Sequence, residues 1–239
     1  MRALVTGASS GIGAGIVEVL CAAGYDVHAL ARRQDRLSAL ATKTGCTIHA
    51  ADVMDTDAMA RVIRDVQPEI VVCNAGRGGG FDGIAATSAE DIAATVALNV
   101  TATLDLLRLC LPGMIERGKG HVVTVGSVAA LYPSTSALYG GSKAAVGMIA
   151  QNLRLELRGT GIRVTDIRPG RVASEFYDVA IEDRAKSAAA QDTGIRELQP
   201  TEIGEAVLHA VGAPRNVNVS TIELQPLEQT YGGLNFDPT

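Results

Sequence analysis

Aromatic residues and paired cysteines are scarce in this sequence. Its 239 residues include no tryptophan, and aromatic side chains make up only 3%. The four cysteines lie far apart and form no Cys-x-x-Cys pair, which predicts reduced, mostly buried thiols and not a disulfide framework. They are Cys21, Cys46, Cys73 and Cys110. We also expect no bound metal.

The sequence shows neither a secretory leader nor an apolar run of transmembrane length. Residues 1–7 enter a strand and a glycine turn directly, so we expect a cytoplasmic protein with no membrane partner. The formal net charge of −5 argues against a broad nucleic-acid-binding surface. With 47% apolar and 20% charged residues, the composition is that of an ordinary globular protein, and 239 residues fit one α/β domain spanning residues 1–239.

Short apolar runs alternate with longer helical patterns along the chain. This alternation is typical of repeated βαβ units, and it predicts a single-domain Rossmann fold of the α/β class, a doubly wound seven-stranded parallel sheet with helices on both faces. We expect strands at residues 3–6, 27–31, 47–50, 70–73, 121–125, 162–167 and 218–224. We expect helices at 11–23, from about 33, at 55–66, as a pair between 89 and 117, at 137–158, and at 201–211 with Thr201 as N-cap.

A glycine-rich turn joins the first strand to the first helix. Residues 7–13 read Gly-Ala-Ser-Ser-Gly-Ile-Gly. A pyrophosphate must approach main-chain N–H groups at a helix N-terminus, and a Cβ atom in the wrong place would block it. Gly7 would allow the tight turn, Gly11 the close approach and Gly13 the packing of helix on strand. The strand–turn–helix context predicts dinucleotide binding, with a purely structural turn as the alternative.

The second strand ends in two arginines, Arg32 and Arg33. In a dinucleotide fold an acid at this place would bind the ribose 2′-hydroxyl of NAD, whereas guanidinium groups can hold a 2′-phosphate. The cofactor expected from these residues is therefore NADP(H). Ser10 is neutral where some NADP enzymes carry a further basic residue, and a solvated basic helix start is the alternative interpretation.

Tyr139 and Lys143 share a face of the expected long helix, because they lie four residues apart. A phenol has a pKa near 10 and is a poor acid–base group at neutral pH, but a nearby positive charge lowers that pKa. Tyr139 could then exchange a proton with a carbonyl or alcohol oxygen. Ser127 follows a strand and could donate a hydrogen bond to the same oxygen. Asn99 could bind a water that links Lys143 to solvent. Taken singly, each of these is a common structural residue.

Together, these residues resemble the short-chain dehydrogenase/reductase family. The segments 6–13, 52–53, 74–76 and 169–170 occur with the single residues above in the family's order, across residues 6–174. The resemblance implies that Asn99, Ser127, Tyr139 and Lys143 form the catalytic set. It implies cofactor contacts from Gly7, Ser9, Ser10, Gly11, Ile12, Gly13, Arg32, Arg33, Asp52, Val53, Asn74, Ala75, Gly76, Tyr139, Lys143, Pro169, Gly170, Val172 and Ser174. The interval from Ser127 to Tyr139 is one residue shorter than is common, and Ser174 replaces the family's threonine.

A narrower resemblance covers residues 111–117, 163–167, 217–219 and 232–235. These segments are similar to NADP-dependent 3-hydroxy acid (serine-type) dehydrogenases and to sulfoacetaldehyde reductases. The similarity implies a small substrate with an anionic end and a homotetramer, or at least a homodimer, with C-terminal tails of about 225–239 reaching across a subunit contact. The polar, alanine-rich segment of about 174–199 would form a lid over the substrate.

Two arginines follow loops that should lie near the nicotinamide end of the cofactor. Arg77 and Arg171 could each pair with a carboxylate or sulfonate, or could be ordinary surface residues. The function expected is hydride transfer between NADP(H) and a small carbonyl or alcohol, such as a 3-hydroxy acid or an anionic aldehyde. A reductase of a neutral ketone or of a secondary-metabolite intermediate, and a non-catalytic dinucleotide sensor, are the alternatives.

Overall fold

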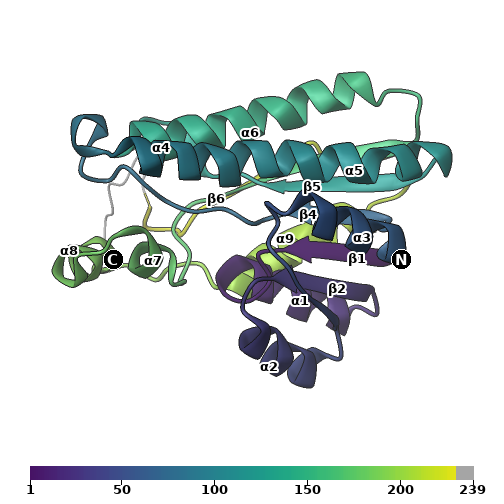
Figure 1. Ribbon diagram of the computed structural model, residues 1–239, viewed down its shortest axis with the longest axis horizontal. Helices are drawn as coiled ribbons and strands as arrows, with labels where there is room; N and C mark the ends of the chain where they lie inside the picture. Colours follow the sequence, from purple (N-terminus) through teal and green to yellow (C-terminus); the bar gives the residue numbers. More distant parts are fainter. Residues whose placement is uncertain (230–239) are drawn as a thin grey trace.

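Seven parallel strands form one sheet at the centre of the molecule (Figure 1). The computed structural model describes residues 1–229. The strand order is β3-β2-β1-β4-β5-β6-β7, so the direction of winding reverses between β1 and β4. This confirms the predicted doubly wound α/β fold. The strands are β1 (Arg2–Thr6), β2 (Asp26–Ala31), β3 (Thr47–Ala50), β4 (Ile70–Cys73), β5 (Gly120–Val125), β6 (Ile162–Pro169) and β7 (Thr221–Leu224).

Helices cover both faces of the sheet (Figure 1). They are α1 (Gly11–Ala22), α2 (Gln34–Thr44), α3 (Thr56–Val66), α4 (Ala89–Val96), α5 (Ala102–Glu116), α6 (Ala137–Glu156), α7 (Phe176–Ala180), α8 (Arg184–Gln191) and α9 (Pro200–Gly212). Side chains of α1, α2 and α9 share one hydrophobic core with the sheet, and those of α3, α5 and α6 share the other. Strands β4 and β5 are buried along their whole length, as expected of a parallel sheet covered on both sides.

Small residues allow α1 and α9 to approach closely. A Cβ atom on Gly15 would lie 2.4 Å from the carbonyl carbon of Pro200, and one on Gly204 would lie 2.7 Å from the carbonyl oxygen of Gly15. Neither distance leaves room for a methyl group. The abundance of glycine in the sequence therefore has a packing role here, because it brings the last helix directly against the helix that follows the glycine turn.

Most expected boundaries lie within two residues of those in the structure, but the start of one strand and the cap of one helix differ in an informative way. Strand β7 begins at Thr221 and not at residue 218, because Asn218 turns its side chain back onto the N–H and carbonyl of Val164. Helix α9 is capped by Gln199 and not by Thr201: Gln199 and Glu202 form a reciprocal capping box, and Pro200 occupies the first turn. The expectation of Thr201 as N-cap was wrong because it overlooked this proline.

The helical run Ala89–Glu116 is long and apolar enough to cross a membrane by length and composition, which the sequence expectation had not anticipated. The same properties occur in a core helix. Leu106, Leu107 and Met114 of this run are buried in the core beside β4 and β5. A π-helical turn, η2 (Ala97–Thr101), interrupts the run. We therefore assign the run to the domain core, with one face left exposed.

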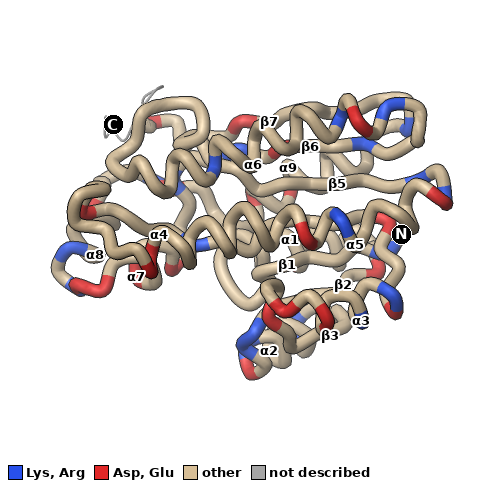
Figure 2. The backbone as a smooth tube through the Cα atoms, turned by 45° about the horizontal axis from the view of Figure 1, so that its top comes forward, with Lys and Arg blue, Asp and Glu red and all other residues tan. Residues whose placement is uncertain are grey.

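Charged residues are spread over the outside of the domain. Figure 2 shows both acidic and basic positions near α2 and α8, and no single broad basic face in this view. The carboxyl ends of β1, β2, β4, β5 and β6 meet at one edge of the sheet. In open α/β sheets ligands bind at this edge, near the reversal of strand order.

Candidate active site

The glycine turn after β1 is closed tightly against the loop after β4. Gly7 and Gly11 have positive φ angles of 65° and 51°, which favour glycine. A Cβ atom on Gly13 would lie 2.3 Å from the carbonyl oxygen of Gly7, and one on Gly7 would lie 2.9 Å from Cα of Ala75. Gly7 and Gly13 thus remove clashes between backbone segments, and the N-terminus of α1 borders the cleft.

Thr6 and Asn74 lock these two loops together. The Asn74 side chain donates to the carbonyl oxygen of Thr6 at 2.9 Å. The Thr6 hydroxyl accepts from the backbone N–H groups of Asn74 and Ala75 at 3.1 and 3.2 Å, and it donates to the carbonyl of Val72 at 3.0 Å. Thr6 is fully buried, so these bonds hold the floor of the cleft rigid.

A cleft of about 350 Å³ opens at this edge of the sheet. It brings together most of the residues that the family resemblance assigns to the cofactor. Those lining it are Gly7, Ser9, Ser10, Gly11, Ile12, Arg32, Arg33, Asp52, Val53, Asn74, Ala75, Gly76, Tyr139, Lys143 and Ser174. Gly13 lies behind the turn, and Pro169, Gly170 and Val172 line a second cavity next to the cleft. The shape and lining of the cleft fit a dinucleotide.

Arg33 is the better organised of the two arginines at the end of β2. Its Nε donates to the Ser9 hydroxyl at 3.1 Å and one Nη donates to the Ser10 hydroxyl at 2.6 Å. Arg32 extends into solvent and approaches Asp52 only at 3.9 Å. The neutral residue at position 10 thus joins a cluster of one guanidinium and two hydroxyls, groups that suit a phosphate.

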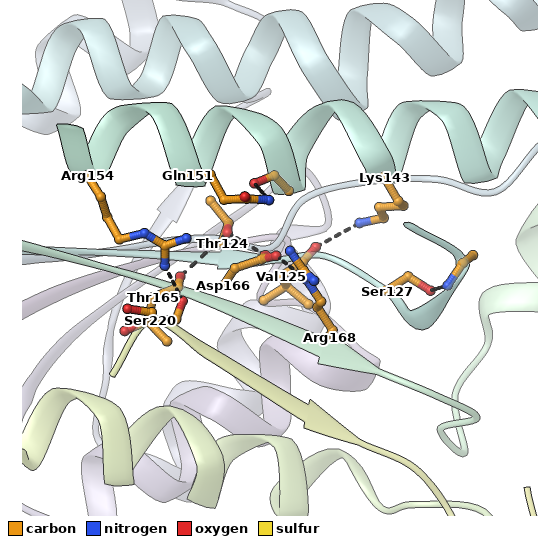
Figure 3. Close-up of polar contacts among 12 residues, drawn as sticks. Thr124, Val125, Ser127, Lys143, Gln151, Arg154, Thr165, Asp166, Arg168 and Ser220 are labelled. Carbon is orange, nitrogen blue, oxygen red and sulfur yellow. Dashed lines mark hydrogen bonds and ion pairs between the residues drawn. The ribbon is translucent and has the colours of Figure 1, made fainter. Parts of the chain in front are cut away.

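Helix α6 carries Tyr139 and Lys143 into the cleft. The hydroxyl of Ser136 caps the helix by accepting from the N–H of Tyr139 at 2.9 Å. One turn later, Lys143 Nζ lies 5.9 Å from the centre of the Tyr139 ring. It donates to the carbonyl oxygen of Val125 at 2.8 Å, as Figure 3 shows. Both residues line the cleft and so share a face of α6, as the four-residue spacing predicted.

Burial dominates the electrostatics of this pair. It raises the pKa of Tyr139 to about 12, while a side-chain hydrogen bond with Ser127 acts in the opposite direction. Burial also lowers the pKa of Lys143 to about 8. The sequence predicts that Lys143, together with an oxidised nicotinamide ring, makes the phenol more acidic. Within the protein alone, burial of the phenol outweighs its hydrogen bond with Ser127, so the effect expected of Lys143 and a bound nicotinamide stays a prediction.

A buried ion pair lies behind Lys143, between β5, β6 and α6 (Figure 3). Asp166 is completely buried and accepts hydrogen bonds from the Thr124 hydroxyl at 2.7 Å and from Arg168 Nε at 2.6 Å. The Asp166 charge raises the pKa of Lys143, and so opposes the larger effect of burial. Nothing in the local sequence pattern indicated this carboxylate as an influence on Lys143.

Asn99 lies on the π-helical turn η2 and is almost fully buried. Its side-chain oxygen accepts from the N–H of Arg77 at 2.8 Å. Its nitrogen donates to the carbonyl of Arg77 at 3.0 Å and to the Ser142 hydroxyl at 2.9 Å. Its amide thus fastens the loop after β4 to α6. The water-binding role expected for Asn99 stays a prediction.

Ser127 lies in the second cavity, which borders the cleft at Tyr139. Phe81, Phe176 and Tyr177 surround Tyr139 there, and the ring centre of Phe176 lies 5.2 Å from that of Tyr139. The sequence interpretation missed all three aromatic residues. Since aromatics are so rare in this chain, the adjacent pair at 176–177 was a signal that could have been used.

The two candidate substrate arginines both have partners inside the protein. Arg171 lines the second cavity, and its Nε donates to Glu197 at 2.6 Å, while one Nη donates to the carbonyl of Ala190. Its guanidinium also stacks 4.2 Å from the ring centre of Tyr177. Arg77 lines the cleft and donates to Asp91 at 3.0 Å.

Comparisons with known proteins agree with this geometry. The sequence pattern of the short chain dehydrogenase family matches residues 1–185. The chain is 35% identical to the NADP-dependent 3-hydroxy acid dehydrogenase of Escherichia coli (strain K12), with 98% of each chain covered. It is 32% identical to a probable NADP-dependent dehydrogenase of Haemophilus influenzae, over 98% of this chain and 96% of that one. The fold is similar to the closed form of serine dehydrogenase complexed with NADP+, with a TM-score of 0.92, 34% identity and full coverage of both chains.

Proposed function

The chain belongs to the short-chain dehydrogenase/reductase family, and on this basis we propose that it transfers a hydride between NADP(H) and a small hydroxy or carbonyl compound. The observation that carries the proposal is the position of Tyr139. Its side chain borders both the glycine-lined cleft and the adjoining cavity that contains Ser127. A proton donor at the junction of the two can serve an oxygen in the second cavity next to a ring held in the first.

The nicotinamide, when bound, accepts or supplies the hydride and in its oxidised form adds a positive charge. The protein's own groups then handle the proton. Tyr139 gives its phenolic proton to the substrate oxygen during reduction and takes one back during oxidation. The Ser127 hydroxyl donates a hydrogen bond to the same oxygen as negative charge develops there. Lys143 stands one helical turn away, where its ammonium group, together with the charge of the oxidised nicotinamide, would favour the phenolate form of Tyr139 against the effect of burial.

Arg33 supports the choice of NADP(H) over NAD(H). Its guanidinium, with the hydroxyls of Ser9 and Ser10, forms a cationic, donor-rich end to the cleft. A 2′-phosphate accepts such donors, whereas a cofactor without the phosphate would leave them unused. The names of the relatives agree with this choice.

The first candidate substrate is a 3-hydroxy acid, or an aldehyde with an anionic end. The relatives with this named activity cover nearly the whole chain. Arg171 supplies a cation for the anionic end of the substrate, because it lines the same cavity as Ser127 and Tyr139. We propose that the substrate anion shares Arg171 with Glu197.

A neutral ketone is the second candidate. Arg77 and Arg171 are both already ion-paired, and Phe81, Phe176 and Tyr177 give the region around Tyr139 an apolar wall. Such a wall suits an uncharged substituent.

We also propose a cytoplasmic homotetramer, or a homodimer, with the segment of about 174–199 as a lid. Val96, Leu104, Met148 and Leu155 leave apolar surface on α4, α5 and α6, which a second copy of the chain could cover. The proposed role of residues 230–239 at a subunit contact lies outside the described residues.

A substrate panel tests the proposed function. NADPH oxidation is measured with 3-oxo acids, anionic aldehydes and neutral ketones, and NADP+ reduction with the matching alcohols. We expect the highest kcat/KM with an acid of the 3-hydroxy/3-oxo class. Turnover confined to neutral ketones would favour the second candidate, and NADPH binding without any turnover would favour a sensor.

A further inference from the structure

Three consecutive residues cross the mouth of the cofactor cleft. Ser174 lies over the glycine turn, where a Cβ atom on Gly11 would come within 3.2 Å of the Ser174 Cβ. Phe176 packs on the ring of Tyr139. Between them, Glu175 reaches the arginines at the start of α2. We call residues 174–176 the strap.

The carboxylate of Glu175 is held mainly by Arg36. One Nη of Arg36 lies 2.8 and 2.6 Å from the two carboxylate oxygens, whereas the nearest contact from Arg33 is 3.4 Å. Arg33 directs its other donors to Ser9 and Ser10. Arg33 therefore belongs to the phosphate-binding cluster, whereas Arg36 holds the strap through the carboxylate of Glu175.

The position of Arg36 outside the cleft explains why the two arginines differ. Glu175 and Arg33 line the cleft, but Arg36 does not, since it lies one helical turn farther along α2. A 2′-phosphate would take over the donors of Arg33, and the 3.4 Å contact of Arg33 with Glu175 would be given up. The phosphate would not remove Arg36, which could keep the carboxylate at the rim.

We propose that Glu175 and Arg36 form a clasp that fastens the strap across the cofactor cleft and slows the release of the bound dinucleotide. The proposal deepens the proposed function, on which it rests. Glu175 and Arg36 are positioning residues, and the clasp acts on either nicotinamide cofactor, while Arg33, Ser9 and Ser10 discriminate between them.

The clasp also connects the two ends of the site. Glu175 and Phe176 are neighbours in the chain, so a strap fastened at Arg36 holds the Phe176 ring against Tyr139. When the clasp opens, the cover over the catalytic tyrosine loosens together with the cover over the cofactor. Because Glu175 and Phe176 are adjacent, the clasp both retains the cofactor and keeps water away from Tyr139.

Release kinetics of NADPH and NADH from the full-length protein test the clasp, with no substrate present. The variants are Glu175→Gln, Arg36→Gln and the double variant. We expect each single change to speed NADPH and NADH release by about two- to fivefold, the range of a half-exposed ion pair. The double variant should release no faster than the faster single variant, because both changes remove one interaction. The ratio of NADPH to NADH affinity should stay within about twofold of the wild-type ratio.

Glu18→Gln is the matched control. Glu18 pairs with Lys43 of α2 at 2.7 Å, an ion pair of similar length that lies away from the strap. This variant should release both cofactors at the wild-type rate.

Three results would overturn the clasp: unchanged release from both single variants, additive effects in the double variant, or tighter binding of NADPH but not NADH by Glu175→Gln. The last result would mean that Glu175 competes with the 2′-phosphate. A wild-type protein that binds neither cofactor saturably would overturn the proposed function itself, and so the two failures are distinguishable.

Discussion

The guanidinium of Arg171 and the carboxylate of Glu197 lie 2.6 Å apart at the place where segment 174–199 returns to the sheet. Backbone bonds flank this contact: the N–H of Leu198 donates to the carbonyl of Arg171, and the N–H of Ala173 donates to the carbonyl of Leu198. These contacts hold the two ends of the proposed lid segment next to each other.

Replacing Arg171 by methionine should destabilise the protein by about 3 kcal/mol, because it leaves a largely buried carboxylate without its partner. Urea unfolding of the variant measures this loss. Arg77→Met is the control: its ion pair with Asp91 is more exposed, so its loss should cost less than about 1 kcal/mol. Equal losses in the two variants would contradict the distinction. The KM of a 3-hydroxy acid, measured on the same variants, shows whether Arg171 also binds the substrate anion.

Tyr139→Phe should lower kcat by about a thousandfold, because the variant loses the proton donor but keeps the ring that packs on Phe176. NADPH affinity, measured by fluorescence titration, should change by less than about threefold. A variant with wild-type kcat would show that another group moves the proton.

Arg33→Ala should weaken NADPH binding by about ten- to a hundredfold and change NADH binding little. A charge-assisted hydrogen bond contributes about 1.5–3 kcal/mol, and only the phosphorylated cofactor uses it. Comparison of KM for the two cofactors measures the effect. Arg32→Ala serves as the control, since Arg32 extends into solvent and should alter the ratio less.

The buried His121 should lower the free energy of unfolding of the protein in acid. It is buried in β5, where its Nε2 bonds with the Thr165 hydroxyl, and burial lowers its pKa to about 3. A lowered histidine pKa gives stability that is present above about pH 6.5 and is lost as the pH falls toward 3. The free energy of unfolding of the wild type should therefore fall faster than that of His121→Asn, by up to about 1.4 kcal/mol per pH unit. Urea titrations between pH 7 and 4 test this, and parallel curves would contradict it.

Gly15→Ala should destabilise the protein, whereas Gly141→Ala should not. A Cβ atom on Gly15 meets the backbone of Pro200 at 2.4 Å, but one on Gly141 meets nothing within 4 Å. We expect a loss of at least about 1 kcal/mol for overpacking at residue 15. We expect a gain of up to about 1 kcal/mol at residue 141, from the better helix propensity of alanine. Thermal melts of both variants provide the comparison.

Local signals in the sequence predicted the fold and most of the cleft. The strand–glycine–helix pattern at residues 3–23 marks a phosphate-binding turn, because only glycine satisfies its backbone geometry. The spacing of Tyr139 and Lys143 places them on one helix face, because the α-helix repeats every 3.6 residues. Both signals depend only on the local geometry of the backbone, so each can be recognised within a single segment of the sequence.

Contacts between distant segments could not be predicted in this way. The sequence shows neither that Asp166 lies behind Lys143, nor that Asn99 stands on a π-helical turn, nor that Glu175 crosses to Arg36. Each depends on how strands and helices pack, and the residues involved are polar types that occur on any surface. The ion pairs of Arg77 with Asp91 and of Arg171 with Glu197 could not be predicted for the same reason.

The amino-acid sequence by itself determined the order of strands and helices, the glycine turn and the residue types that bring acid–base chemistry to one helix, because these follow from short-range sterics and periodicity. Only the tertiary structure decided the acidity of Tyr139 and Lys143 and the partner of each arginine. Burial and distance set those properties, and both arise when segments far apart in the chain meet at the edge of the sheet.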